Sequence, residues 1–180
     1  MESIKEKQNK IFDLMKADFH YKNKLETPRL QKVTVSCGIG SLKDKKKIDL
    51  IVDRLTKITG QKPSLRGAKK SIASFKVREG DSVGVLITLR GQRMYGFLDK
   101  LINVAFPRTK DFRGLNTKGI DNIGNLTIGI KEHTIFPETS DEDVRDIFGL
   151  AITVVSTAKD KKSAEVLFRH LGFPFSKGSE

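Results

Sequence analysis

Several features that identify common classes of protein are scarce in this sequence. Its single cysteine, Cys37, cannot form a disulfide within the chain and fits a reducing compartment. No apolar run approaches the ~18 residues that span a bilayer, and we expect no secretory signal because the N-terminal residues lack an apolar core. The three histidines lie far apart, with no second cysteine or acidic cluster at metal-ligand spacing, so we expect neither a metal site nor a cofactor.

Motifs of catalysis are also missing. Gly38 and Gly40 follow a predicted strand, but the third glycine of a dinucleotide-binding fingerprint does not follow them, and there is no P-loop. No Ser-His-Asp order stands out, and the acidic residues fall mostly in predicted turns and helix starts. An enzyme acting on RNA would need a carboxylate cluster or an activated nucleophile among basic loops. The sequence therefore favours a binding protein that is not an enzyme.

The dominant feature that is present is positive charge. Lysine and arginine total 34 against 22 acidic residues, for a net charge of +12 and a pI near 9.8. Such a balance favours a polyanionic partner, either a nucleic acid or an anionic membrane surface. A membrane partner would need a basic helix with strong apolar anchors, and Asp13 and Asp18 weaken the one candidate, at residues 3–19. We therefore expect a nucleic acid and no membrane contact.

Apolar periodicity and capping residues predict the secondary structure. Apolar stripes predict helices at residues 3–19, 44–59, 91–105 and 160–171, and Pro107 is expected to stop the third of them. We predict strands at 30–37, 75–78, 83–89, 126–130 and 150–156, and a further strand that ends at residues 65–66. Because helices and antiparallel strands segregate in such a chain, we expect an α+β fold, with an antiparallel sheet covered by helices on one face.

The opposite face of this sheet and several projecting basic loops are then left for binding. Residues 1–180 are expected to form a single domain, with an N-terminal helix and connector at 1–27 and a sheet-and-helix body at 28–180. The open face would carry Lys32, Thr34 and Thr88. Folded RNA is read largely by shape, through phosphates and 2′-hydroxyls, whereas DNA is usually read by a helix or ribbon in the major groove. No predicted helix presents Arg, Asn or Gln along one face, so RNA is favoured.

Residues 59–93 carry the clearest binding signal. Only Glu79 and Asp81 oppose the cations of this stretch, which are interleaved with glycines: Lys62, Arg66, Lys69, Lys70, Lys76, Arg78, Arg90 and Arg93. We predict a loop at 67–74 and a hairpin that pairs 75–78 with 83–89. Cations on a strand face, beside small residues that let a backbone approach, suit a phosphate chain. An ordinary basic hairpin without a partner is the alternative.

A second basic segment and one acidic cluster complete the candidate surfaces. Residues 107–125 form a long, glycine-rich loop, which is usually functional or mobile in a compact domain. Its cations are Arg108, Lys110, Arg113 and Lys118. The acidic cluster consists of Asp141, Glu142, Asp143 and Asp146. It could cap a short turn or meet a basic protein partner.

Several short blocks of sequence follow one another in a specific order between Pro28 and Phe175. They are Gly60-Gln61-Lys62-Pro63, Lys69-Lys70-Ser71-Ile72-Ala73, Phe75-Lys76-Val77-Arg78, Thr88-Leu89-Arg90-Gly91, Arg93-Met94-Tyr95, Pro107-Arg108, Asp111-Phe112-Arg113-Gly114, Gly129-Ile130-Lys131-Glu132, Ile135-Phe136-Pro137-Glu138, Thr157-Ala158-Lys159 and Pro174-Phe175. In this order they resemble the large-subunit ribosomal protein five family, the bacterial-type 5S rRNA-binding proteins of the central protuberance.

The resemblance implies a structural role in the large subunit of cytoplasmic ribosomes. It implies that 5S rRNA is bound by Ser36, Gln61 and Thr88, with Lys32 and Arg90 beside them. It assigns the P-site tRNA to the loop before Phe75 and its flanks, with Arg66, Lys69, Lys70, Ser71, Lys76 and Arg78. It also implies a bridge to small-subunit ribosomal protein thirteen, formed by Arg108, Lys110, Arg113 and Asp143. The 23S-type rRNA is a further implied partner, and a non-ribosomal basic RNA-binding protein is the alternative function.

The sequence departs from the usual pattern of that family at three places. Ser36 stands where Asn is usual, and because serine has a shorter reach, a contact with 5S rRNA there would be weaker or water-mediated. The usual Phe-Asp-Gly-Arg-Gly-Asn-Tyr is replaced by residues 120–126, Ile-Asp-Asn-Ile-Gly-Asn-Leu, which lack an arginine and two aromatics. His133 replaces a common Gln. None of these changes falls within the central basic stretch, residues 59–93.

Overall fold

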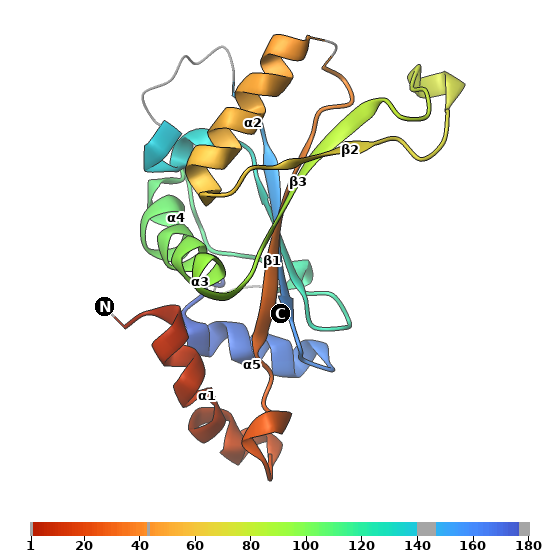
Figure 1. Ribbon diagram of the computed structural model, residues 1–180. Helices are drawn as coiled ribbons and strands as arrows, with labels where there is room; N and C mark the ends of the chain where they lie inside the picture. The colour runs from red at the N-terminus through yellow and green to blue at the C-terminus, as the bar shows by residue number, and fades with distance from the viewer. Residues whose placement is uncertain (1, 43, 140–146, 177–180) are drawn as a thin grey trace. The chain divides into compact units, whose positions relative to one another are not determined.

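The computed structural model describes residues 2–42, 44–139 and 147–176. Within these ranges the strands form one antiparallel, five-stranded sheet in the order β2-β3-β1-β5-β4. The strands are β1 (Leu30–Gly38), β2 (Ser64–Gly67), β3 (Ser82–Leu89), β4 (Leu126–Ile130) and β5 (Leu150–Ser156), drawn as arrows in Figure 1. Together with the helices, this sheet confirms the predicted α+β fold class.

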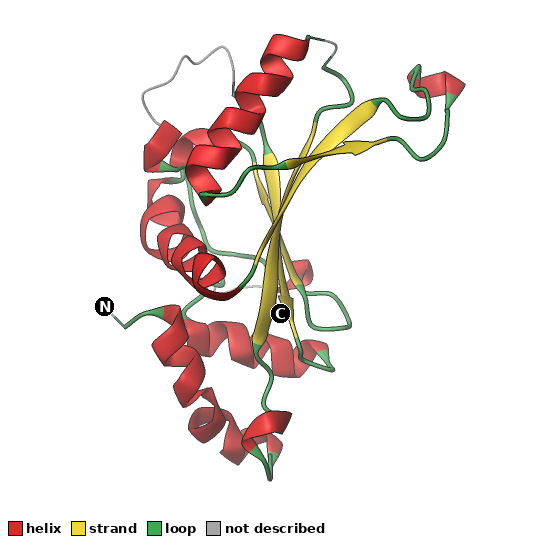
Figure 2. Ribbon diagram, viewed as in Figure 1, coloured by secondary structure: helices red, strands yellow, loops and turns green. Residues whose placement is uncertain are grey.

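The helices lie where apolar periodicity predicts them. They are α1 (Ile4–Phe19), α2 (Lys45–Thr59), α3 (Gly91–Lys100), which continues through a π-helical turn (Leu101–Ala105) into α4 (Phe106–Arg108), and α5 (Lys161–Leu171). Figure 2 distinguishes them from the strands and from the connecting loops, several of which contain single 3-10 turns. Across the described ranges, no helix has the length and apolar character needed to cross a membrane.

The chain divides into two compact units. The first consists of Met1–Val33, Arg90–Ile128 and Thr153–Glu180, and the second of Thr34–Leu89 and Gly129–Ile152. Helices α1, α3 and α5 belong to the first unit, whereas α2, β2 and β3 belong to the second. The candidate contact residues are therefore distributed over both units.

One face of the sheet is buried and the other is open along the longer strands. In β3, Val85, Ile87 and Leu89 are buried, whereas Leu86 and Thr88 between them are only half-buried. Strands β1 and β5 show the same alternation. Since successive side chains of a strand point to opposite faces, the half-buried residues form the open face that the sequence predicts.

Helix α2 of the second unit begins and ends at the predicted capping residues. The Asp44 side chain accepts a hydrogen bond from the backbone N–H of Lys46 at 3.0 Å. Gly60 closes the helix with a left-handed φ of +68°, and its N–H donates to the carbonyl of Thr56 at 2.8 Å. The buried stripe between these caps contains Ile51, Leu55 and Ile58.

Polar contacts hold α1 in the first unit. The backbone N–H of Ile4 donates to Oδ1 of Asp99 at 2.9 Å, and the Gln8 amide donates to the Tyr95 hydroxyl at 3.0 Å. The side-chain oxygen of Gln8 also accepts from the backbone N–H of Leu30 at 3.2 Å. A single glutamine thus ties α1 both to α3 and to the start of β1.

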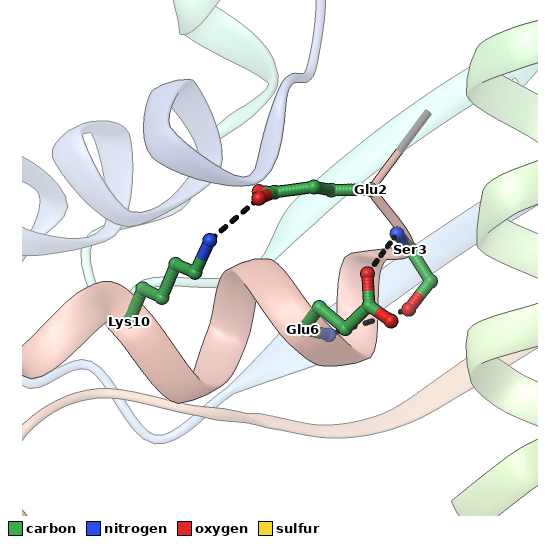
Figure 3. Close-up of polar contacts among 4 residues, drawn as sticks. All are labelled: Glu2, Ser3, Glu6 and Lys10. Carbon is green, nitrogen blue, oxygen red and sulfur yellow. Dashed lines mark hydrogen bonds and ion pairs between the residues drawn. The ribbon is translucent and has the colours of Figure 1, made fainter.

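The first turn of α1 is closed by a capping box, shown in Figure 3. The Ser3 hydroxyl accepts from the backbone N–H of Glu6 at 3.3 Å, and the Glu6 carboxylate accepts from the backbone N–H of Ser3 at 3.0 Å. Two N–H groups that would otherwise lack helical partners are satisfied in this way. Nearby, the hydrogen bond from Lys10 lowers the pKa of Glu2.

The helical run that starts at Gly91 reaches Arg108, so the prediction that Pro107 stops it is wrong. Proline breaks a helix interior because it has no N–H to donate. Here the preceding turn is π-helical, and the N–H of Phe106 bonds to the carbonyl of Leu101, five residues back. Pro107 then occupies the first turn of α4, where a missing donor costs little.

Gly114 and Gly96 are expected to respond in opposite directions to alanine. Gly114 has a φ of +101°, and a Cβ there would lie 2.6 Å from the backbone nitrogen of Ser176. Gly114→Ala should lower the free energy of unfolding by about 1–3 kcal/mol. Gly96 is exposed in α3 with open space around a Cβ, so Gly96→Ala should raise it by roughly 0.5–1 kcal/mol. Urea unfolding measures both, and a stabilised Gly114→Ala would contradict the expectation.

Candidate nucleic-acid interface

Ser36 and Thr88 lie on neighbouring strands of the second unit. Ser36 is on β1 and Thr88 is on β3, and these two strands are adjacent in the sheet. Both residues are half-buried, and each stands between two buried residues along its strand. Both hydroxyls are therefore on the face opposite the core. The structure brings these two predicted contact residues to one surface.

Gln61 is brought next to Thr88 by the end of α2. Gly60 turns the chain out of the helix, and the Thr59 hydroxyl accepts from the backbone N–H of Gln61 at 3.4 Å. The Gln61 side-chain amide then donates to the backbone carbonyl of Thr88 at 3.3 Å, across 27 residues of sequence. Within the described residues its side-chain oxygen has no partner. Gln61 therefore presents a hydrogen-bond acceptor that is already held in place.

Lys32 and Arg90, the predicted neighbouring cations, belong to the first unit. Lys32 is half-buried on β1, beside the buried Val33. Arg90 is exposed, and its extended backbone directly precedes α3. No ion pair among the described residues neutralises either cation. Both charges are therefore available to a phosphate.

The central basic stretch forms a loop between two paired strands. The paired residues of β2 and β3 are Ser64↔Leu86, Leu65↔Val85, Arg66↔Gly84 and Gly67↔Ser82. Residues 68–81 extend beyond this pairing and project away from the sheet of the second unit in Figure 1. Two hydrogen bonds close the base of this loop, from the N–H of Ala68 to the carbonyl of Asp81 (2.8 Å) and from the N–H of Gly80 to the carbonyl of Ala68 (3.0 Å).

The predicted hairpin between 75–78 and 83–89 is wrong, because β3 pairs with β2 instead. Residues 73–75 form a 3-10 turn. Lys76 follows with a left-handed φ of +51°, a conformation that interrupts an extended strand. The segment assigned to a strand is consequently the tip and return of the loop.

Hydrogen bonds inside the loop of residues 68–81 give it a defined shape. Ile72 and Val77 exchange backbone hydrogen bonds of 3.0 and 3.3 Å across the tip. The Ser71 hydroxyl accepts from the backbone N–H of Glu79 at 2.9 Å. Ser71, which was predicted as an RNA contact, therefore also supports the loop. The loop is a folded projection with a defined backbone.

The cations of this loop and its flanks are exposed. They are Arg66, Lys69, Lys70, Lys76 and Arg78, and none of them forms an ion pair in the part of the chain that the structure describes. The Asp81 carboxylate accepts from the backbone N–H of Arg78 at 2.7 Å, so it stabilises the turn. Five cations against Glu79 and Asp81 leave this projection positively charged.

The predicted bridge residues that can be placed lie in the first unit. Arg108 ends α4, Lys110 follows in the next turn, and both are exposed. Arg113 is also exposed and follows Phe112, whose ring stacks on Phe106 with a centroid separation of 5.1 Å. The acidic cluster at 141–146, which includes Asp143, lies outside the described residues. The structure thus places three bridge cations on the surface.

The segment that departs from the expected pattern is a closed turn. The Asp121 carboxylate accepts from both the backbone N–H (2.6 Å) and the side-chain amide (3.0 Å) of Asn125. Gly124 has a φ of +83°, and a Cβ there would lie 2.7 Å from a neighbouring side chain. Ile123 is 67% exposed. Asp121, Gly124 and Asn125, which the segment shares with the expected pattern, build the turn. Ile123, at the position of the arginine, faces solvent, whereas Ile120 and Leu126, at the positions of the two aromatics, are buried.

Two buried polar residues of the second unit were not predicted. Arg54 lies on the buried stripe of α2, where only aliphatic residues were expected, and is 5% exposed. One of its guanidinium nitrogens, Nη1, lies 3.4 Å from Nε2 of His133. The His133 ring is buried and stacks on Phe148, with a centroid separation of 4.1 Å. The burial of Arg54 could have been read from its spacing from Ile51 and Ile58, which places the three residues on the same face of the helix.

Comparison with known proteins shows the family to which the sequence belongs. The sequence matches the family described as "Ribosomal protein L5" over residues 23–78, and it matches the C-terminus described for the same ribosomal family over residues 82–175. The chain belongs to the ribosomal protein L5 family. This membership decides between the two functional alternatives in favour of a ribosomal protein.

Similar proteins in the ribosomal protein L5 family match nearly the whole chain. "Large ribosomal subunit protein uL5" of Sulfurimonas denitrificans is 47% identical over 180 residues, covering 99% of each chain. The protein of the same name from Carboxydothermus hydrogenoformans is 44% identical over 179 residues, covering 98% of this chain and all of its own. That from Trichlorobacter lovleyi is 46% identical over 169 residues, covering 93% of this chain and 94% of its own.

Membership in the ribosomal protein L5 family sets the general role of the chain. It is a structural constituent of the large ribosomal subunit and not an enzyme. Its place is the ribosome of the cytoplasm. A large-subunit protein has ribosomal RNA and the ribosome as partners, which accounts for the net charge of +12.

Proposed function

We propose that the chain binds 5S rRNA through Ser36, Gln61 and Thr88, and that Lys32 and Arg90 contribute further contacts. The observation that carries this proposal is the contact of the Gln61 amide with the Thr88 carbonyl at 3.3 Å. A fixed amide and short hydroxyls suit recognition of phosphates and 2′-hydroxyls, by which folded RNA is read. Because the amide is held before binding, less side-chain entropy is lost when the RNA docks.

The loop of residues 68–81, with its flank at Arg66, is proposed to contact the P-site tRNA. Its internal hydrogen bonds support this assignment, because they give the loop a defined shape beyond the pairing of β2 with β3. The contact residues would be Arg66, Lys69, Lys70, Ser71, Lys76 and Arg78. Exposed cations on a shaped projection bind phosphates at low ordering cost.

A third surface is proposed to bridge the two ribosomal subunits. Arg108, Lys110 and Arg113 are exposed cations on one continuous segment of the first unit. These three cations and Asp143 would contact small-subunit ribosomal protein thirteen. The argument for Asp143 is its negative charge alone. Remaining cations of the chain would contact 23S-type rRNA, the other polyanion of the large subunit.

A gel-shift titration tests the proposed contact with 5S rRNA. We expect Gln61→Ala to weaken binding by about 3- to 10-fold, because hydrogen bonds of an amide are lost, and to leave the dependence on salt unchanged. Arg90→Ala should lower the slope of log affinity against log salt by about 0.7–0.9. Both series run from ~50 to ~200 mM salt, a range over which phosphate contacts strongly affect affinity.

Gln92→Ala is the matched control, because Gln92 is an exposed amide in α3 outside the proposed contact set. An unrelated RNA of equal length serves as competitor for the native chain. Binding that the competitor erases, or an equal loss for Gln92→Ala and Gln61→Ala, would refute the assignment of Gln61.

A further inference from the structure

Phe75 is the most unusual surface residue of the second unit. Its side chain is 75% exposed, whereas every other phenylalanine of the chain is buried or half-buried. A phenylalanine left in water forgoes the stabilisation that burial of its ring would give. Exposed large apolar residues that are not scattered at random mark contact sites, and Ile72 in the same loop is 47% exposed.

The position of Phe75 is set by the loop and not by a core. It ends the 3-10 turn at the tip, and the next residue, Lys76, has a left-handed backbone and donates its N–H to the carbonyl of Ala73 at 3.0 Å. Below the tip, Ile72 and Val77 close the loop with two backbone hydrogen bonds. The backbone that carries Phe75 is therefore fixed at the tip of the loop of residues 68–81.

The surroundings of Phe75 indicate the chemistry of its partner. Lys69, Lys70 and Lys76 are exposed near it in the loop, so an anionic partner is favoured. An aromatic ring among cations matches a nucleic acid, which offers phosphates to the lysines and a flat base to the ring. A protein partner with an apolar pocket would not account for the accompanying positive charge.

We propose that Phe75 stacks on an exposed nucleobase of the tRNA that the loop contacts. This inference rests on the proposed contact between the loop and P-site tRNA, and it adds a component that salt does not screen. Cations supply the salt-dependent attraction, because they release counterions from phosphates. Stacking on a base face is largely independent of base identity, which suits a protein that must accept every tRNA.

The test uses ribosomes that carry variants of the full chain and measures dissociation of deacylated tRNA from the P site at several salt concentrations. Phe75→Ala should speed dissociation by about tenfold, in line with the loss of one stacked base, and should leave the salt slope unchanged. Phe75→Tyr keeps the ring and should behave like the native chain. Phe75→Leu keeps apolar bulk without the π face and should behave like Phe75→Ala. Ser74→Ala is the neighbouring control and should have no effect.

The outcomes separate this inference from the proposed function. If Lys69→Ala with Lys70→Ala speeds dissociation but Phe75→Ala does not, the loop contacts tRNA and the stacking proposal is wrong. If neither variant changes dissociation, the tRNA contact itself is wrong, and the stacking proposal falls with it. Native behaviour of Phe75→Leu would also overturn stacking, because bulk alone would then suffice.

Discussion

Lys69→Ala combined with Lys70→Ala is expected to loosen P-site tRNA while leaving 5S rRNA binding unchanged. Both lysines are exposed in the loop of residues 68–81, whereas Ser36, Gln61 and Thr88 lie on or beside the sheet. Loss of two phosphate contacts should lower the salt slope of tRNA binding by about 1.4–1.8. Affinity at ~0.1 M salt should fall on the order of tenfold or more.

The two activities are measured separately for the lysine variant. A gel shift reports 5S rRNA affinity of the purified chain, and filter binding to ribosomes that carry the variant reports P-site tRNA affinity. Lys45→Ala with Lys46→Ala is the matched control, because these adjacent lysines are equally exposed in the second unit but lie in the first turn of α2. Equal losses in both assays would show that the loop does not act separately from the sheet face.

Phe168→Ala is expected to destabilise the chain more than any other change considered above. The Phe168 ring in α5 is fully buried and packs edge-on against Phe173, with a centroid separation of 5.3 Å. Truncation of a buried phenylalanine leaves a cavity and costs about 3–5 kcal/mol. That is a large share of the roughly 5–15 kcal/mol that stabilises a folded protein.

Thermal unfolding measures this effect as a lower midpoint. The unfolding midpoint of a chain of this size shifts by roughly 2–4 °C per kcal/mol. Phe168→Ala should therefore lower the midpoint by about 6–20 °C. Val166→Ala, two residues earlier in α5 and only half-buried, should lose much less. Equal midpoints for the two variants would mean that α5 does not contribute Phe168 to the core as the structure indicates.

The helices were readable from the sequence because their signals are local. Asp44 and Gly60 bracket α2, and both capping contacts join residues within about one helical turn. Gly172 ends α5 in the same left-handed conformation, with a φ of +94°. Such contacts depend on backbone geometry near the residue itself, so the surrounding fold changes them little.

Strand pairing in the basic stretch was not readable in the same way. The alternation of apolar and basic residues at 75–78 resembles a strand, yet β3 takes β2 as its partner. The choice between two candidate partners is a long-range competition, and short exposed strands specify it weakly. The left-handed Lys76 could not be anticipated, since lysine rarely adopts positive φ.

The sequence alone was sufficient for the family, the fold class and the location of the cations. Charge belongs to the residue itself, and a lysine such as Lys69 is almost always exposed. Only the tertiary structure decided that Gln61 meets Thr88, that Phe75 is exposed and that Cys37 is buried, where desolvation raises the pKa of its thiol. These outcomes depend on which distant surfaces meet, and competing arrangements differ by small free energies that no local pattern encodes.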